Sequence, residues 1–174
     1  MSAEGDGDED TTSDMTDMGT DSGPDATPDP TTDVTPDGLR RTIETNLGAP
    51  VFLTQAFAAG LPGGLDGAVV NVTDWRTARP YPDHFSYKLA KGALDTFTRA
   101  AAEHLAPRIR VNAVALGAIL PPPGKGVKHL QRLAPEIPLG STGTPDDIVR
   151  GVRYLLAAEF VTGEVLHVDG GQYL

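Results

Sequence analysis

The sequence of residues 38–174 predicts an α/β fold in which helices flank a parallel sheet. Short apolar runs alternate with longer segments whose apolar residues recur every three or four positions. The first pattern is typical of strands buried on both faces, and the second of amphipathic helices. Because helix and strand follow one another in turn, the strands are expected to be parallel.

The start of the chain differs in composition from this region. Residues 1–37 contain twelve Asp and Glu and no Lys or Arg, whereas the remainder contains the other twelve acids and all fourteen basic residues. The formal net charge of −10 is therefore −12 from this segment and +2 from the rest. With Val34 as its only large branched apolar residue, the segment cannot bury enough surface to offset its ordering entropy. We expect a disordered acidic tail over residues 1–35 and a folded domain over residues 36–174.

A first helix is expected to begin with Thr35 as its N-cap and Pro36 at the first helical position. Pro50 is expected to bend this helix. Its apolar face is formed, at spacings of four, by Ile43, Leu47 and Val51.

The remaining elements are expected in the order strand, helix, strand, short helix, helix and strand. Their approximate ranges are 68–72, 85–105, 109–115, 127–133, 145–156 and 164–168. A glycine-rich turn at 60–67 precedes the first strand. The run from Thr144 to Asp147 supplies an N-cap, a first-turn proline and early acids, which are typical of a helix start.

The Tyr-x-x-x-Lys pattern of Tyr87 and Lys91 indicates proton-transfer chemistry. Side chains four positions apart lie on one face of a helix. An ammonium beside a phenol favours the phenolate, so Lys91 is expected to lower the pKa of Tyr87 and to let it exchange a proton with a carbonyl, an alcohol or an imine. The same pattern also occurs by chance on solvated helix faces, so the neighbouring sequence has to decide whether this pair is catalytic.

Several further blocks accompany this pair. They are Thr45-Asn46-Leu47, Asn71-Val72, Arg110-Val111-Asn112-Ala113-Val114 and Thr162-Gly163-Glu164 with Val168-Asp169-Gly170-Gly171. In order and spacing they resemble the C-terminal part of the short-chain dehydrogenase/reductase family. The resemblance covers about residues 36–174 and implies part of a Rossmann-type, doubly wound parallel sheet. Asp74-Trp75, Arg79-Pro80-Tyr81 and residues 117–120 are most similar to the bacterial pteridine reductase-like branch.

That resemblance implies catalytic roles for four residues. Tyr87 would protonate the reduced substrate, and Lys91 would hold the cofactor ribose. Asn46 would sit at a helix irregularity and anchor a water of the proton relay. Asp74 stands where the family usually has a serine, and its carboxyl could bond a nitrogen heterocycle. Read without the resemblance, Asn46 could merely satisfy backbone groups and Asp74 could be an ordinary turn residue.

The resemblance also implies a cofactor, NADPH or NADH. The backbone near Gly117 and Ile119 would meet its nicotinamide carboxamide, and the substrate would contact Asp74, Trp75 and Tyr87. Leu116 replaces the proline that is usual before this glycine, and Pro121-Pro122-Pro123 replaces the usual threonine. The implied reaction is the reduction of a pterin or a related carbonyl or imine compound.

One part of the family pattern is missing. No glycine-rich turn of the kind that lays a dinucleotide pyrophosphate on a helix N-terminus follows any expected strand. With about three strands, one sheet edge is expected to be bare. Three explanations stay open: a fragment or misread gene product of an enzyme, an enzyme whose other half is a second polypeptide, or an inactive remnant that serves at most as a dimerisation module.

The composition of the chain argues against several kinds of metal site and binding partner. The chain has no cysteine, so disulfides and thiolate metal sites are excluded, and its four histidines show no metal-ligand spacing. Basic clusters interleaved with aromatics, which would indicate nucleic acid, are missing, and no apolar run is long enough to span a bilayer. We expect a cytoplasmic protein with a small-molecule substrate. The resemblance implies a homo-oligomer formed through the helices at 38–58 and 85–105.

Overall fold

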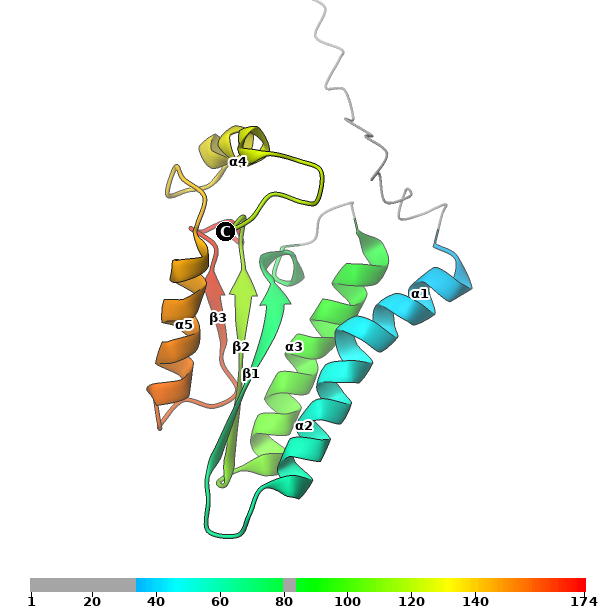
Figure 1. Cartoon of the computed structure of the whole chain (residues 1–174), viewed down its shortest axis with the longest axis vertical. Coiled ribbons are helices and arrows are strands. Elements are labelled where there is room, and N and C mark those ends of the chain that lie inside the picture. The colour runs from blue at the N-terminus through cyan, green and yellow to red at the C-terminus, as the bar shows by residue number, and fades with distance from the viewer. Residues whose placement is uncertain (1–33, 80–83) are drawn as a thin grey trace, which may run out of the picture.

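Helices cover both faces of a three-stranded parallel sheet in the computed structural model, which describes residues 34–79 and 84–174 (Figure 1). The strands β1 (Gly67–Asp74), β2 (Ile109–Leu116) and β3 (Val165–Val168) lie side by side in that order. Both neighbouring pairs are parallel. The α/β class and the three expected strands are confirmed, while residues 1–33 of the expected acidic tail lie outside the described residues.

The helices form two layers around the sheet. The layer on one face consists of α1 (Pro36–Ile43), the π-helical segment η1 (Glu44–Gly48), α2 (Ala49–Gly60) and α3 (Phe85–Leu105). The opposite face is covered by α5 (Pro145–Ala157), and α4 (Val127–Leu133) lies beyond the carboxyl ends of the strands (Figure 1). Two 3-10 turns, η2 (Trp75–Thr77) and η3 (Ala134–Glu136), complete the described elements.

The core is centred on β2, which is buried from both sides. Val111, Ala113, Val114 and Ala115 are all fully inaccessible to solvent. Arg110 ties this strand to the end of α5, because its guanidinium donates to the carbonyls of Leu155 and Leu156, each at 2.8 Å. These carbonyls belong to the last turn of the helix, where intrahelical partners run out.

Both helix starts that the sequence predicted are confirmed. The Thr35 hydroxyl accepts a hydrogen bond from the Gly38 N–H at 3.1 Å. At the start of α5, Asp147 accepts bonds from both the N–H and the hydroxyl of Thr144, each at 2.7 Å. A reciprocal capping box of this kind satisfies N–H groups that a helix N-terminus leaves unpaired.

The irregularity of the first helix lies one turn before Pro50. Residues 44–48 are π-helical, and the Ala49 N–H bonds to the Glu44 carbonyl, five residues back. Pro50 has no N–H, so it cannot donate the bond that an α-helix would direct at the Asn46 carbonyl. π-Helix is rare in proteins and occurs mostly as a single turn of this kind inside an α-helix. The helix type therefore changes just before Pro50, over the segment that contains Asn46.

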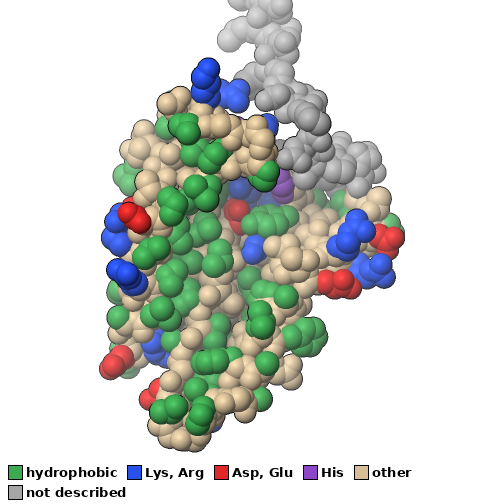
Figure 2. Space-filling view, viewed as in Figure 1, with side chains coloured by type: hydrophobic (Ala, Val, Ile, Leu, Met, Phe, Trp, Pro, Cys, Tyr) green, Lys and Arg blue, Asp and Glu red, His purple; other side chains and the backbone are tan. Residues whose placement is uncertain are grey.

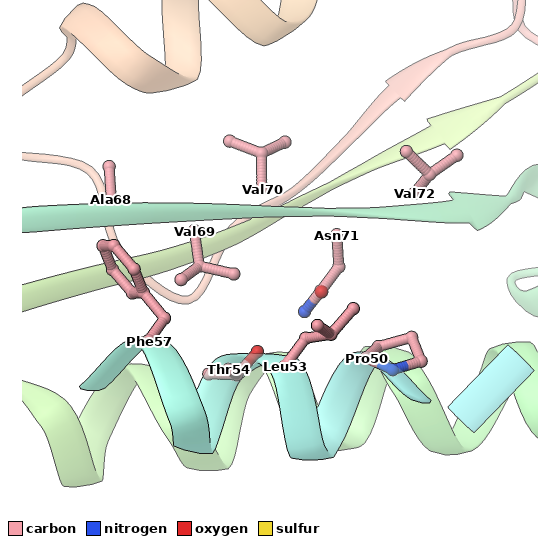
Figure 3. A pocket seen from close by; sticks show the side chains of 9 residues that line it. All are labelled: Pro50, Leu53, Thr54, Phe57, Ala68, Val69, Val70, Asn71 and Val72. Atoms are coloured by element: carbon pink, nitrogen blue, oxygen red, sulfur yellow. The ribbon is translucent and has the colours of Figure 1, made fainter. Parts of the chain in front are cut away.

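One side of β1 is open, as the count of strands predicted. Among the residues described, no strand pairs with β1 on the side away from β2. A cavity of about 400 Å³ runs along this edge, where Pro50, Leu53 and Phe57 of α2 lie opposite β1 (Figure 3). Hydrophobic side chains gather over the region between α5 and α2 (Figure 2). The first of the predicted site residues, Asp74, is the last residue of β1.

Candidate active site

Asp74 and Tyr87 are brought together because β1 ends where α3 begins. Asp74 is the last residue of β1, and Tyr87 lies in the first turn of α3, thirteen residues later. The Tyr87 hydroxyl donates a long hydrogen bond of 3.4 Å to Oδ2 of Asp74. A phenol and a carboxylate in contact at the carboxyl edge of a parallel sheet can pass a proton between them.

Lys91 lies one helical turn beyond Tyr87, as the spacing predicted. Its Nζ is 5.6 Å from the centre of the Tyr87 ring. The same nitrogen donates to the Val72 carbonyl of β1 at 2.9 Å. The ammonium therefore stands over the ring face and is anchored to the strand, and within residues 34–79 and 84–174 two of its three N–H donors have no partner.

The expected effect of Lys91 on Tyr87 is wrong in this structure. The pKa of Tyr87 is raised to about 12, first by burial and then by the charge and hydrogen bond of Asp74, against a smaller lowering by Arg76. Lys91 faces the ring instead of the hydroxyl, so the nearest charge to the phenol is a carboxylate. Tyr87 consequently keeps its proton throughout the neutral pH range.

Asp74 joins the η2 turn to Tyr87, and the Arg76 guanidinium approaches both of its carboxylate oxygens, at 3.4 Å and 3.5 Å. Oδ1 accepts the Arg76 N–H at 2.9 Å and so caps the η2 turn, while the Arg76 guanidinium approaches it at 3.4 Å. Oδ2 faces Tyr87. The turn role and the catalytic role that the sequence offered as alternatives are thus compatible, because the cap fixes the carboxylate whose other oxygen meets the phenol.

The other expected substrate residue, Trp75, is only 8% exposed, and the Arg76 guanidinium lies 5.0 Å above its ring. Its aromatic surface packs inside the protein, so most of it is covered. Pro80 and Tyr81, which contributed to the resemblance, fall outside the described residues.

Asn46 lies in the π-helical segment, which matches the helix irregularity implied for it. Its side-chain amide donates to the Thr42 carbonyl at 3.1 Å. The segment packs against α3. No direct hydrogen bond joins Asn46 to Tyr87 or Lys91 among the described residues, so the structure places Asn46 beside the helix that carries the pair without bonding it to them.

The loop after β2 is held tightly to the end of β3. The Gly117 N–H donates to the Val168 carbonyl at 3.1 Å, and a Cβ at Gly117 would lie 2.5 Å from Cα of Asp169. Only glycine permits that approach. The next amide, of Ala118, donates to the Gln172 side chain at 2.7 Å.

Within the described parts of the chain, the Ile119 N–H makes no hydrogen bond, so this backbone donor is left for a ligand. The Gly117 N–H is already engaged. Sequence reasoning missed Gln172, which clamps this loop from 54 residues away. Its position directly after Asp169-Gly170-Gly171 is the sequence signal that could have found it.

The residues present fit the nicotinamide end of a dinucleotide. Among the residues that the structure describes, none engages two of the Lys91 N–H donors, which suit ribose hydroxyls, or the Ile119 amide, which suits a carboxamide. No glycine-rich pyrophosphate turn occurs in the sequence. The cavity of Figure 3 and a second one of about 520 Å³ beside β3 are lined by neither Tyr87 nor Lys91.

This parallel sheet, with Tyr87 and Lys91 at its carboxyl edge, is part of a Rossmann-type α/β fold. A family profile described as enoyl-(acyl carrier protein) reductase matches residues 22–172. The chain belongs to the short-chain dehydrogenase/reductase family, whose members are NAD(P)-dependent oxidoreductases. The match starts at residue 22, inside the segment expected to precede the domain.

Two curated relatives and one solved structure illustrate the similarity. The chain is 37% identical over 146 residues to protein FixR of Bradyrhizobium diazoefficiens, covering 79% of this chain and 50% of that protein. It is 30% identical over 138 residues to the dihydromonapterin reductase of Klebsiella pneumoniae, covering 78% and 58%.

The solved structure is FolM alternative dihydrofolate reductase 1 from Brucella canis, complexed with NADP. It superimposes with a TM-score of 0.75 at 37% identity, over 81% of this chain and 56% of that one. The chain thus spans about half the length of the proteins it matches. In the described residues no helix is long and apolar enough to cross a membrane.

Proposed function

We propose that this chain carries the proton-donor and substrate half of an NADP(H)-dependent short-chain reductase that acts on a pterin or a related carbonyl or imine compound. The observation that carries the proposal is the contact of the Tyr87 hydroxyl with Asp74, at 3.4 Å. Similarity to a dihydromonapterin reductase and to a FolM reductase supports the choice of a pterin. A carboxylate can bond a ring N–H of such a substrate, which a serine does less strongly.

In this reaction Tyr87 is the proton donor. When bound, the reduced nicotinamide would supply a hydride to the substrate carbon. Tyr87 would then give its proton to the adjoining nitrogen or oxygen, and the phenolate would regain a proton from water by way of the Asp74 carboxylate. The raised pKa of Tyr87, about 12, keeps the donor loaded at neutral pH. Lys91 would hold the ribose, Asn46 a relay water, and Ile119 the carboxamide.

We expect the 174-residue chain by itself to bind NADPH too weakly to be saturated. Millimolar affinity corresponds to only about −4 kcal/mol, and contacts at the nicotinamide end alone scarcely exceed that. We expect no saturable binding below about 1 mM when NADPH is titrated against the 174-residue protein by fluorescence or calorimetry. A micromolar dissociation constant would mean that the chain, alone or as an oligomer, completes the nucleotide site, and the half-site interpretation would have to be abandoned.

Catalysis is tested by a chimera in which residues 34–174 replace the matching part of the Brucella canis reductase. The chimera should reduce a dihydropterin with NADPH. The matched control is the same chimera with Tyr87→Phe, which should bind the nucleotide equally well. A folded chimera that binds NADPH and reduces neither pterins nor simple carbonyl compounds would contradict the proposed function.

The exposed face of the first helical layer supports homo-oligomerisation through the helices at 38–58 and 85–105. Phe52 and Leu53 of α2 are 68% and 70% exposed, and Leu89 of α3 is 47% exposed. Large apolar side chains in such numbers on one layer are typical of an interface. Sedimentation velocity should show an oligomer that Phe52→Lys weakens. A monomer at micromolar concentration would favour a different use of this face.

A further inference from the structure

We propose that Lys91 has a second role in this chain: its ammonium caps the open edge of β1 at the Val72 carbonyl and limits the antiparallel pairing of that edge with a second copy of the chain. This role belongs to the free chain and does not rest on the proposed function. It can be measured without cofactor, substrate or turnover.

The backbone groups of every second residue of β1 face the open edge. The Gly67 N–H donates to the Arg108 carbonyl at 2.8 Å, in the register that pairs β1 with β2. Because alternate residues of a strand turn their N–H and C=O groups to the same neighbour, the odd-numbered residues of β1 face β2. The backbone groups of Ala68, Val70 and Val72 therefore face the side on which, among the residues described, no strand pairs.

Lys91 occupies one acceptor in this row. Its Nζ donates to the Val72 carbonyl at 2.9 Å, and this bond is exposed to solvent. Within residues 34–79 and 84–174, no hydrogen bond reaches the outward backbone groups of Ala68 or Val70. A lysine on an exposed strand edge is one of the devices by which proteins keep such edges from pairing with other chains. The position of the Lys91 ammonium suits this task.

The open edge is self-complementary when two copies meet in antiparallel order. With Val70 opposite its own copy, Ala68 of one chain lies opposite Val72 of the other, and each such pair exchanges two N–H···O bonds. The Ala68 N–H would then donate to the Val72 carbonyl of the second copy, which is the acceptor that Lys91 holds. Pairing must therefore displace one ammonium in each copy, and a hydrogen bond from a charged donor is stronger than one between neutral groups.

The apolar surface along this edge favours pairing but is too small to hold a permanent dimer. Leu53, Phe57 and Val72 line the edge cavity and are 70%, 41% and 46% exposed (Figure 3). Since even a large aromatic side chain presents no more than about 250 Å², the three together offer less than roughly 400 Å² per copy. A stable interface buries about 800 Å² per partner. Pairing at this edge is thus weak enough for one ammonium in each copy to decide it.

The test is the self-association of the complete 174-residue chain after the cap is removed. Lys91→Met and Lys91→Ala both remove the ammonium, and Lys91→Arg keeps a charged donor. Lys128→Met, the same change at an exposed lysine of α4, is the matched control. Every protein would carry Phe52→Lys, so that association through the helices does not mask the edge. Sedimentation velocity gives the dissociation constant, and amide hydrogen exchange shows which residues of β1 pair.

In the two uncapped variants we expect the dissociation constant of the dimer to fall by about tenfold or more, because pairing no longer displaces two charged hydrogen bonds. The amides of Ala68 and Val70 should exchange more slowly in the dimer, whereas that of Val69, which faces β2, should change little. Lys91→Arg and Lys128→Met should stay near the parent protein. Val70→Pro removes an outward N–H and none from the ladder with β2, so adding it to Lys91→Met should restore the behaviour of the parent.

Uncapped variants with unchanged circular dichroism that associate no more than the parent would overturn the proposal, and so would an equal gain in Lys128→Met. A gain that survives Val70→Pro, or that leaves the outward amides of β1 unprotected, would do the same, because the contact would then lie elsewhere. A parent protein that already pairs through these amides at micromolar concentration would show that Lys91 does not protect the edge.

Discussion

The replacement of Asp74 by asparagine should lower the pKa of Tyr87, because it removes a negative charge and a strong acceptor 3.4 Å from the hydroxyl. The present value is about 12 against an ordinary 10.0, with burial as the largest cause and Asp74 second. Asp74→Asn leaves the burial, so the new value should fall and still lie above the ordinary one. A drop of one unit would correspond to about 1.4 kcal/mol.

Tyrosinate absorbance near 295 nm measures this directly. With a pKa of about 12, only about one tenth of Tyr87 is ionised at pH 11, and a drop of one unit would raise that to about one half. Tyr87→Phe provides the difference spectrum that isolates Tyr87 from the other three tyrosines. Asp66→Asn, an exposed acid, is the matched control.

The raised pKa of Tyr87 also makes the free energy of unfolding depend on pH. A folded-state pKa above the unfolded value favours the fold below about pH 10, and that contribution is lost as pH rises towards about 12. For this half-buried side chain the loss is about 1 to 2 kcal/mol after solvent screening. Because Asp74→Asn should lower the folded-state pKa of Tyr87, this contribution to stability should become smaller and be lost at a lower pH. An unchanged titration of Tyr87 in a folded Asp74→Asn protein would refute the argument that Asp74 holds the proton on Tyr87.

Three further outcomes are expected. In the chimera, Tyr87→Phe should reduce turnover by about 10²-fold or more while sparing NADPH binding, whereas Lys91→Ala should harm both, as stopped-flow and binding assays can show. Asp74→Ser should cost dihydropterin reduction more than reduction of a simple carbonyl compound, and equal losses would argue against a pterin nitrogen as the partner of Asp74. Deleting residues 1–34 should leave the thermal midpoint nearly unchanged, because that composition offers little to pack, and a fall of about several degrees would contradict the boundary proposed at residue 35.

Local signals in the sequence determined the elements of the fold. The helix at 85–105 is found with those bounds, because its apolar residues recur over 21 positions and both its ends are marked by breaks in that pattern. The Thr144 start was readable because a capping box is confined to four consecutive residues. The parallel sheet followed from the alternation of elements, and its bare edge from the number of strands. The family was readable because its blocks keep their order and spacing.

Tertiary structure decided the properties that depend on burial and on contacts between distant residues. Spacing placed Lys91 one turn from Tyr87, but the direction of the pKa of Tyr87 depends on how deeply the ring is buried and on the carboxylate across the gap between β1 and α3. The clamp of Gln172 on the Ala118 amide joins residues 54 positions apart. Desolvation and through-space charge are set by the packed protein and leave no periodic mark in a sequence, whereas helix starts, faces and breaks are set by neighbours along the chain.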